Sequence, residues 1–131
     1  MNKILTFSPA SVTSMEVHLA WASLEILADD VDELQIMAAG DDNDVNDLKV
    51  EEKAGKLTIE QPTYGLTIKL NGERWMQILI RLPRSWKGAV DANTIAGPLR
   101  ARGVQGTDIT FDTVSGDLRA ANLSAIALSL R

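Results

Sequence analysis

Residues 90–108 read VDANTIAGPLRARGVQGTD, and residues 109–127 read ITFDTVSGDLRAANLSAIA. The second stretch repeats the first after nineteen residues, and nine positions keep their identity or chemical kind. A third copy begins at Leu128, in step with Val90 and Ile109. A unit this short cannot bury its own apolar side chains. The repeat is therefore typical of folds in which successive units stack on one another.

Each copy contains two short runs in which apolar and polar residues alternate. In the first copy, Val90 and Ala92 belong to one run, and Leu99 and Ala101 to a second run of opposite parity beyond Gly97. Alternation predicts strands with one buried face, and the change of parity predicts a corner. We therefore expect an all-β, β-solenoid-like stack of parallel, in-register strands about 4.8 Å apart. An antiparallel β-sandwich is the alternative.

Stacked copies predict a core made of columns of like residues. One column holds Val90, Ile109 and Leu128, and another holds Leu99 and Leu118. Because the end of the sequence cuts the third copy short, the column ends at an edge strand that no Pro, bulge or inward charge protects. We expect either further copies in a longer parent protein or a two-fold dimer that buries these edges.

Three short stretches resemble a known family. The sequences TIAGPL (residues 94–99) and TVSGDL (residues 113–118) resemble the repeated T-x-S-G-D-[LIV] signature of the bacterial putative-adhesin family, also called the toastrack or DUF4097 family. The run ILIRLP (residues 78–83) resembles the strand ending in Leu-Pro that precedes these repeats in the family. The first signature departs from the family pattern at Ala96 and Pro98.

The resemblance, which is clearest over residues 48–131, implies a non-enzymatic all-β module of bacterial surface or envelope-stress proteins. It carries over no catalytic, cofactor-binding or metal-binding residue. The repeat, the resemblance and the lack of a catalytic set together favour an interaction or scaffold role. The unprotected C-terminal solenoid edge predicts a protein partner or self-association there. The signature turn also has a structural explanation, because Gly permits unusual backbone angles and Ser or Asp can bond the turn.

Length and charge limit the architecture and the partners. The chain of 131 residues is expected to form one all-β domain, residues 1–131, with N-terminal strands and an acidic loop in 1–47, central strands in 48–89 and the repeats in 90–131. Its net charge is −5, and no Lys/Arg cluster along the sequence offsets it, so nucleic acid is not an expected partner. Residues 1–5 resemble the start of a signal peptide, but Thr6, Ser8, Pro9 and Ser11 break the apolar run, and no stretch is long enough for a membrane span. This leaves a cytoplasmic chain or one held at the envelope by a parent protein.

Residues 24–39 are ambiguous. Apolar residues fall three or four positions apart, as on one face of a helix: Leu24, Leu27, Val31, Leu34 and Ala38. Acidic residues crowd the middle of the stretch, however, and alternation resumes at residue 34. We expect strand, acidic turn and strand, with a helix as the alternative.

The central third is predicted to contain several strands. Alternation predicts strands at residues 48–50 and 57–59, a third at 66–70 before the Asn71-Gly72 turn, and a fourth from residue 76 to 82. The fourth strand is apolar on one face and presents Trp75, Gln77 and Leu79 on the other. We expect the N-terminal strands to cover it on both sides. The alternative is a contact surface made by Trp75 and Leu79.

One acidic stretch has part of a calcium-binding pattern. Asp42, Asp44 and Asn46 occupy positions 1, 3 and 5 of an EF-hand loop. Asp47 replaces the turn glycine, and Lys53 replaces the bidentate glutamate. We therefore expect a solvated loop, no metal or other cofactor, and no effect of calcium on stability.

The remaining candidates for chemistry are one histidine and three tryptophans. His18 is the single histidine, and its apolar neighbours predict an outward-facing surface position. No catalytic triad or histidine-rich metal site can be assembled, so we expect no enzyme activity. Trp21, Trp75 and Trp86 could stack on sugar rings, so a carbohydrate-binding or carbohydrate-active domain is the alternative function.

Overall fold

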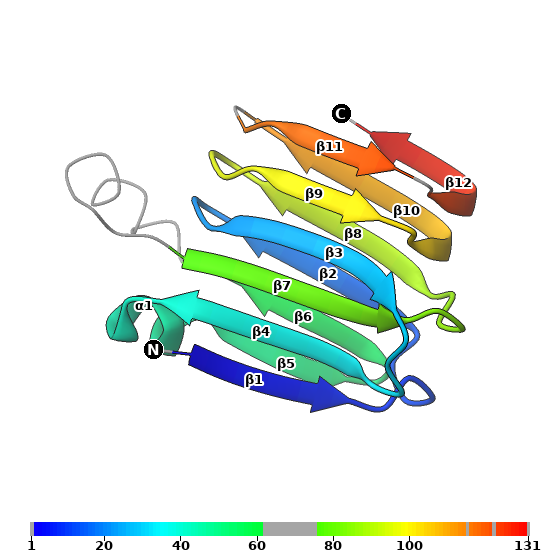
Figure 1. The fold of residues 1–131 in the computed structure, drawn as a ribbon, viewed down its shortest axis with the longest axis horizontal. Coiled ribbons are helices and arrows are strands. Elements are labelled where there is room, and N and C mark those ends of the chain that lie inside the picture. The colour runs from blue at the N-terminus through cyan, green and yellow to red at the C-terminus, as the bar shows by residue number, and fades with distance from the viewer. Residues whose placement is uncertain (1, 62–75, 115, 122, 131) are drawn as a thin grey trace.

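The computed structural model describes residues 2–61, 76–114, 116–121 and 123–130, and gives the backbone alone for residues 43, 44 and 124–130. These residues form an all-β fold of two six-stranded sheets, which lie one behind the other in Figure 1. In spatial order, sheet A contains β1 (Asn2–Phe7), β4 (Leu34–Gly40), β7 (Met76–Pro83), β3 (Ser23–Asp29), β9 (Leu99–Arg102) and β11 (Leu118–Ala121). Sheet B contains β12 (Ser124–Leu130), β10 (Gln105–Thr113), β8 (Ala89–Thr94), β2 (Ser14–Leu19), β6 (Lys56–Glu60) and β5 (Lys49–Lys53).

Each copy of the repeat places one strand in each sheet, and we call such a pair of strands a coil. The first coil of the repeat is β8 and β9, and the second is β10 and β11. Equivalent strands pair in parallel and in register: Val90 lies beside Ile109, and Leu99 beside Leu118. Leu128 of β12 lies beside Ile109 in turn. The predicted columns are confirmed in the backbone register.

The sheets are mixed. Antiparallel pairing among the described strands is confined to β1 with β4, β4 with β7, and β5 with β6, at the end of the molecule away from the repeats. The repeats themselves are parallel, as predicted, and not antiparallel as the sandwich alternative required. The two corners of each coil bring the chain back to the first sheet, beside the equivalent strand of the preceding coil and running in the same direction. Parallel pairing requires such a connection.

The spatial order of the strands differs from their order in the sequence. β2 lies between β6 and β8 in sheet B, and β3 lies between β7 and β9 in sheet A. After β3 the chain forms β4, which lies next to the edge strand β1 in sheet A, and then β5 and β6 of sheet B. β7 comes later in the sequence and lies between β4 and β3. The repeats therefore stack on the N-terminal strands β2 and β3, and not on the strands that precede them in the chain.

The ambiguous residues 24–39 form β3 and β4, as predicted, and the helix alternative is wrong. Alternate residues of both strands are buried, among them Leu24 and Leu34. The acidic turn between the strands is largely exposed, and Arg84 Nε lies 2.9 Å from Asp30 Oδ1 there. Burial of every second residue is explained by the pairing of both strands with β7, because the same side of each strand then faces the core.

The acidic stretch is a short helix, α1 (Asp42–Asp47), and not the predicted solvated loop. Val45 is fully buried, and Leu48 just after the helix is 4% exposed. Burial of these two apolar side chains fixes the stretch against the core, and Asp42 and Asp47 are left exposed. Within the described residues no helix is long and apolar enough to cross a membrane.

The repeated signature forms one corner of each coil. The Thr94 hydroxyl donates to the carbonyl oxygen of Gly97 at 2.8 Å, and the Thr113 hydroxyl donates to that of Gly116 at 2.6 Å. Neither glycine has a positive φ, so the prediction that they serve through unusual backbone angles is wrong. Instead, a Cβ on Gly97 would overlap the carbonyl oxygen of Ala22, and one on Gly116 would overlap that of Gly97. Glycine is needed because the corners stack closely.

Replacing Gly97 with alanine is expected to lower the free energy of unfolding by about 2 kcal/mol, because the added methyl group forces stacked backbone apart. Urea unfolding measures the loss. The matched control is Ala96→Ser at the neighbouring exposed corner position, where we expect a change within about 0.5 kcal/mol. Equal losses in the two variants would contradict the close stacking.

Gln61, just after β6, completes the corner between β2 and β3. Its side-chain Oε1 accepts hydrogen bonds from three successive backbone amides, those of Ala20, Trp21 and Ala22, at 2.9, 2.9 and 3.0 Å. At the next corner the amide of Ala96 donates to a backbone oxygen, that of Ala20, at 2.8 Å. A side chain therefore does for the first corner what the backbone of a neighbouring coil does for the second.

Candidate functional site

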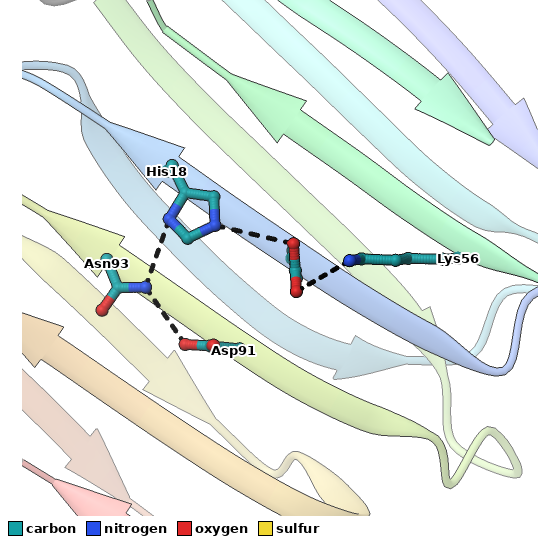
Figure 2. Close-up of polar contacts among 5 residues, drawn as sticks. His18, Lys56, Asp91 and Asn93 are labelled. Carbon is teal, nitrogen blue, oxygen red and sulfur yellow. Dashed lines mark hydrogen bonds and ion pairs between the residues drawn. The ribbon is translucent and has the colours of Figure 1, made fainter. Parts of the chain in front are cut away.

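A chain of polar contacts crosses three strands on the outer face of sheet B (Figure 2). Lys56 Nζ of β6 lies 2.9 Å from Glu16 Oε1 of β2, and Glu16 Oε2 lies 3.7 Å from His18 Nε2. His18 Nδ1 lies 3.3 Å from Asn93 Nδ2 of β8, which also donates to Asp91 Oδ1 at 3.1 Å. A ring protonated at Nε2 satisfies both of its contacts, because Nδ1 can then accept from the amide.

Lys56 controls the acidity of Glu16. The hydrogen bond from Lys56 lowers the pKa of Glu16 below its ordinary value of 4.5, burial opposes this shift, and the charges of Lys56 and His18 add to it. The Glu16 side chain is 34% exposed, so solvent screens the pair.

Replacing Lys56 with methionine is expected to reduce stability at neutral pH and to have no effect in acid. The folded-state pKa of Glu16 is lowered, so the stabilisation is complete above the unfolded value near 4.5 and disappears as the pH falls through the lower folded value. Melting temperatures at pH about 7 and about 2 measure the difference. The control is Lys53→Met, an exposed lysine of β5. A loss that persists in acid would show that Lys56 acts through packing.

The polar array lies on the surface of sheet B, where His18 and Asn93 also border a pocket of about 210 Å³. His18 is 44% exposed on the outer face, as its neighbours in the sequence predicted. Among the described residues, no three His, Asp or Glu side chains converge on a possible metal position. Asp42 and Asn46 are exposed on α1, and the Asp44 backbone lies in the same helix, which spreads its residues around an axis and does not wrap them around an ion.

An apolar row lies on the outer face of sheet A. Leu79 of β7 is in register with Met37 of β4, and Met37 is in register with Ile4 of β1. Leu79 and Met37 are half-buried, and Ile4 is 63% exposed. The row lines a pocket of about 480 Å³, which Glu25 and Arg100 also border. The predicted contact residue Leu79 therefore lies on an apolar surface.

The prediction that N-terminal strands cover both faces of the Leu79 strand is wrong, because Gln77 is exposed on the outer face. The N-terminal strands lie beside this strand within the sheet. β4 and β3 flank β7, which buries alternate residues: Met76, Ile78, Ile80 and Leu82. The two predicted faces of the strand are confirmed over residues 76–82. Trp75, the predicted strand at 66–70 and the Asn71-Gly72 turn lie outside the described residues.

The C-terminal edge consists of β11 in sheet A and β12 in sheet B. Among the described strands, β11 pairs with β9 alone and β12 with β10 alone. Leu128 lies beside Ile109, and Leu130 beside Phe111. β1 and β5 lie at the opposite end of the stack (Figure 1), so neither N-terminal strand covers this edge.

Comparison of the sequence with protein families agrees with this architecture. The family described as Toastrack DUF4097 matches residues 12–131. The chain belongs to the toastrack family. The match includes β2, β3 and β4, which lie before residue 48, where the resemblance in the sequence was faint.

Solved structures share the fold of this toastrack chain. A putative cell adhesion protein from Clostridium sporogenes has 10% identity and a TM-score of 0.60, over 100% of this chain and 99% of that chain. A putative lipid binding protein from Parabacteroides distasonis has 14% identity and a TM-score of 0.50, over 92% of this chain and 51% of that chain. At these identities the likeness concerns the fold alone. Comparison with curated proteins gives no significant match.

Two tryptophans of the toastrack chain are packing residues. Trp21 and Trp86 are each 5% exposed, and Trp86 Nε1 donates to the carbonyl oxygen of Val12 at 2.8 Å. Neither ring offers a face on which a sugar could stack, and Trp75 lies outside the described residues. The tryptophans that motivated the carbohydrate alternative therefore give it no support in the described part of the chain.

The toastrack repeats also carry a basic surface that was not predicted. Arg100 and Arg102 of β9 and Arg119 of β11 are exposed on the outer face of sheet A, and half-buried Arg81 of β7 lies on the same face. The sequence has no dense Lys/Arg run here, and the arginines come together only in the fold. The signal was present in the repeat, because Arg100 and Arg119 occupy the same position in the two copies.

Proposed function

We propose that this chain is a single-domain, non-enzymatic interaction and scaffold module, built as a solenoid-like stack of coils, which binds a second copy through its C-terminal edge. Membership of the toastrack family and the adhesin-like description of one structural relative support a binding role. The side chains of the polar array are open to solvent, with His18 44% exposed and Glu16 34% exposed, which supports the absence of catalysis.

The observation that carries the proposal is that both sheets finish in an edge strand at the same end of the molecule. β11 is the last strand of sheet A and β12 is the last strand of sheet B, and each has one strand neighbour in the described part of the chain. An edge strand presents a row of backbone donors and acceptors that favours pairing with another strand. A two-fold axis across the edge would pair β12 with its symmetry mate and would close the association at a dimer.

Sedimentation velocity over a concentration series tests the proposal. We expect the wild-type chain to reach a dimer plateau, and we expect the double variant Leu128→Lys/Leu130→Lys to remain monomeric. Ser129→Lys is the matched control. Ser129 lies between Leu128 and Leu130 on the same strand, beside Thr110, and its substitution should leave the dimer intact. Far-ultraviolet circular dichroism checks that each variant is folded. A monomeric wild type at every concentration, or a dimer that survives the double substitution, would overturn the proposal.

A further inference from the structure

The two outer faces of the repeated coils carry opposite charges. The basic face, on sheet A, consists of Arg100, Arg102 and Arg119. The acidic face, on sheet B, consists of Asp91, Asp108 and Asp112, each of which alternates with a buried residue such as Ile109. The alternation thus puts positive charge on one side of the slab and negative charge on the other.

The charges of the basic face are not neutralised within the described part of the molecule. No ion pair among the described residues involves Arg100, Arg102 or Arg119. Arg119 lies beside Arg100 in register, and like charges directly opposite on neighbouring strands repel. Glu25 of β3 lies beside Arg100 in register, and Asp29 lies on the same face of β3. The arginines Arg81, Arg100, Arg102 and Arg119 outnumber these two acidic residues, so the face keeps a positive excess.

The acidic face likewise carries an excess of negative charge at the repeat end of sheet B. Asp91 accepts a hydrogen bond from Asn93, which leaves its charge in place. No ion pair among the described residues involves Asp108 or Asp112. The lysine that neutralises Glu16, Lys56, lies on β6, away from the repeats.

The basic and acidic faces have the same spacing because they belong to the same two coils. The arginines lie on β9 and β11, and the aspartates lie on β8 and β10, with strands about 4.8 Å apart in both sheets. If a second copy is stacked on the first along the normal of the sheets, β9 and β11 of one copy lie over β8 and β10 of the other. The spacing between the two strands is the same in both pairs.

We infer that copies of this chain associate face to face, with the basic face of one copy on the acidic face of the next. The partner is thus a second copy of the chain, selected by charge complementarity. This inference goes beyond the proposed function, because it uses the faces of the sheets and not the C-terminal edge. The contact is heterologous and leaves one basic and one acidic face free, so the assembly grows without closing. Exposed ion pairs are weak and screened by salt, so growth requires high protein concentration and low salt.

Charge reversal with a mixing step tests the inference. Arg100→Glu/Arg119→Glu makes both faces acidic, and Asp91→Lys/Asp112→Lys makes both faces basic. We expect wild-type sedimentation coefficients to rise steadily with concentration at about 20 mM salt and not at about 500 mM salt. Each variant alone should associate at least about tenfold more weakly than wild type. An equimolar mixture of the two variants should recover the wild-type association. Lys53→Glu on β5 is the control and should behave as wild type.

Each result distinguishes the faces from the edge. A wild type without salt-sensitive growth, variants that associate individually as strongly as wild type, or a mixture that does not recover association would overturn the inference. The Leu128→Lys/Leu130→Lys variant should keep the salt-sensitive growth while losing the edge dimer. Loss of both in that variant, with its circular dichroism unchanged, would assign all association to the edge and would also overturn the inference.

Discussion

Replacing Phe111 with alanine is expected to lower the free energy of unfolding by about 3 to 5 kcal/mol. Phe111 is fully buried in β10, between Ala92 of β8 and Leu130 of β12 in the register. Truncating the ring removes apolar surface from the core and leaves a cavity that paired strands on both sides cannot close. Urea unfolding followed by circular dichroism measures the loss.

The control for this variant is Arg119→Ala in the same coil. Arg119 is exposed on the outer face of sheet A, so we expect a change within about 0.5 kcal/mol. The two variants together test the assignment of inner and outer faces. A larger loss for Arg119→Ala than for Phe111→Ala would mean that the strands are displaced by one residue, which exchanges the two faces.

Replacing Gln61 with leucine is expected to cost about 3 to 6 kcal/mol, because three buried backbone amides lose their acceptor together. Leucine has nearly the volume of glutamine, so packing changes little. The amides of Ala20, Trp21 and Ala22 lie at a corner where the chain turns from sheet B to sheet A, and water has little access there because Gln61 itself is 7% exposed.

Gln61→Glu is the matched variant, since it keeps an oxygen acceptor at the same reach. We expect it to lose much less stability than Gln61→Leu at neutral pH, because a carboxylate accepts hydrogen bonds from backbone amides. Thermal unfolding of both variants provides the comparison. Equal losses would show that the side chain acts through its shape and not through its acceptor oxygen.

Much of the repeated third was predictable from the sequence. The period of nineteen residues predicts the in-register pairing of Val90 with Ile109, and the alternation predicts which side of each strand is buried. These features are local or strictly periodic, so a single sequence contains them. The two strands within residues 24–39 were predictable for the same reason.

Features that depend on distant parts of the chain were not predictable. Gln61 follows an ordinary strand in the sequence, and its role arises because β6 lies beside β2, forty residues earlier. The position of β7 between β3 and β4 likewise depends on pairing that no local pattern encodes. The Asp42–Asp47 helix was missed because Val45 is a single apolar residue in an acidic stretch, and burial of one residue has no period.

The basic face shows a different limit of prediction from the sequence. Arg100, Arg102 and Arg119 are separated in the sequence by apolar residues and by a whole strand of the other sheet, so a search for dense basic runs passes over them. The folded coils bring them onto neighbouring strands. Candidate surfaces of a stacked repeat are therefore found by comparing equivalent positions in successive copies, and not by local composition.

The strands nearest the two termini, β1 and β12, lie at opposite ends of the stack. Tension applied between the termini therefore acts across the strands, along the direction of the interstrand hydrogen bonds. Under such a load the bonds of a terminal strand break one after another, as in opening a zipper, while the interior strands stay paired. Beyond β1 the chain continues into the interior strands β2 and β3, so this stepwise opening applies to the C-terminal repeats. There each coil would detach in turn at low force, whereas a pull along the strands would load every bond of a ladder at once.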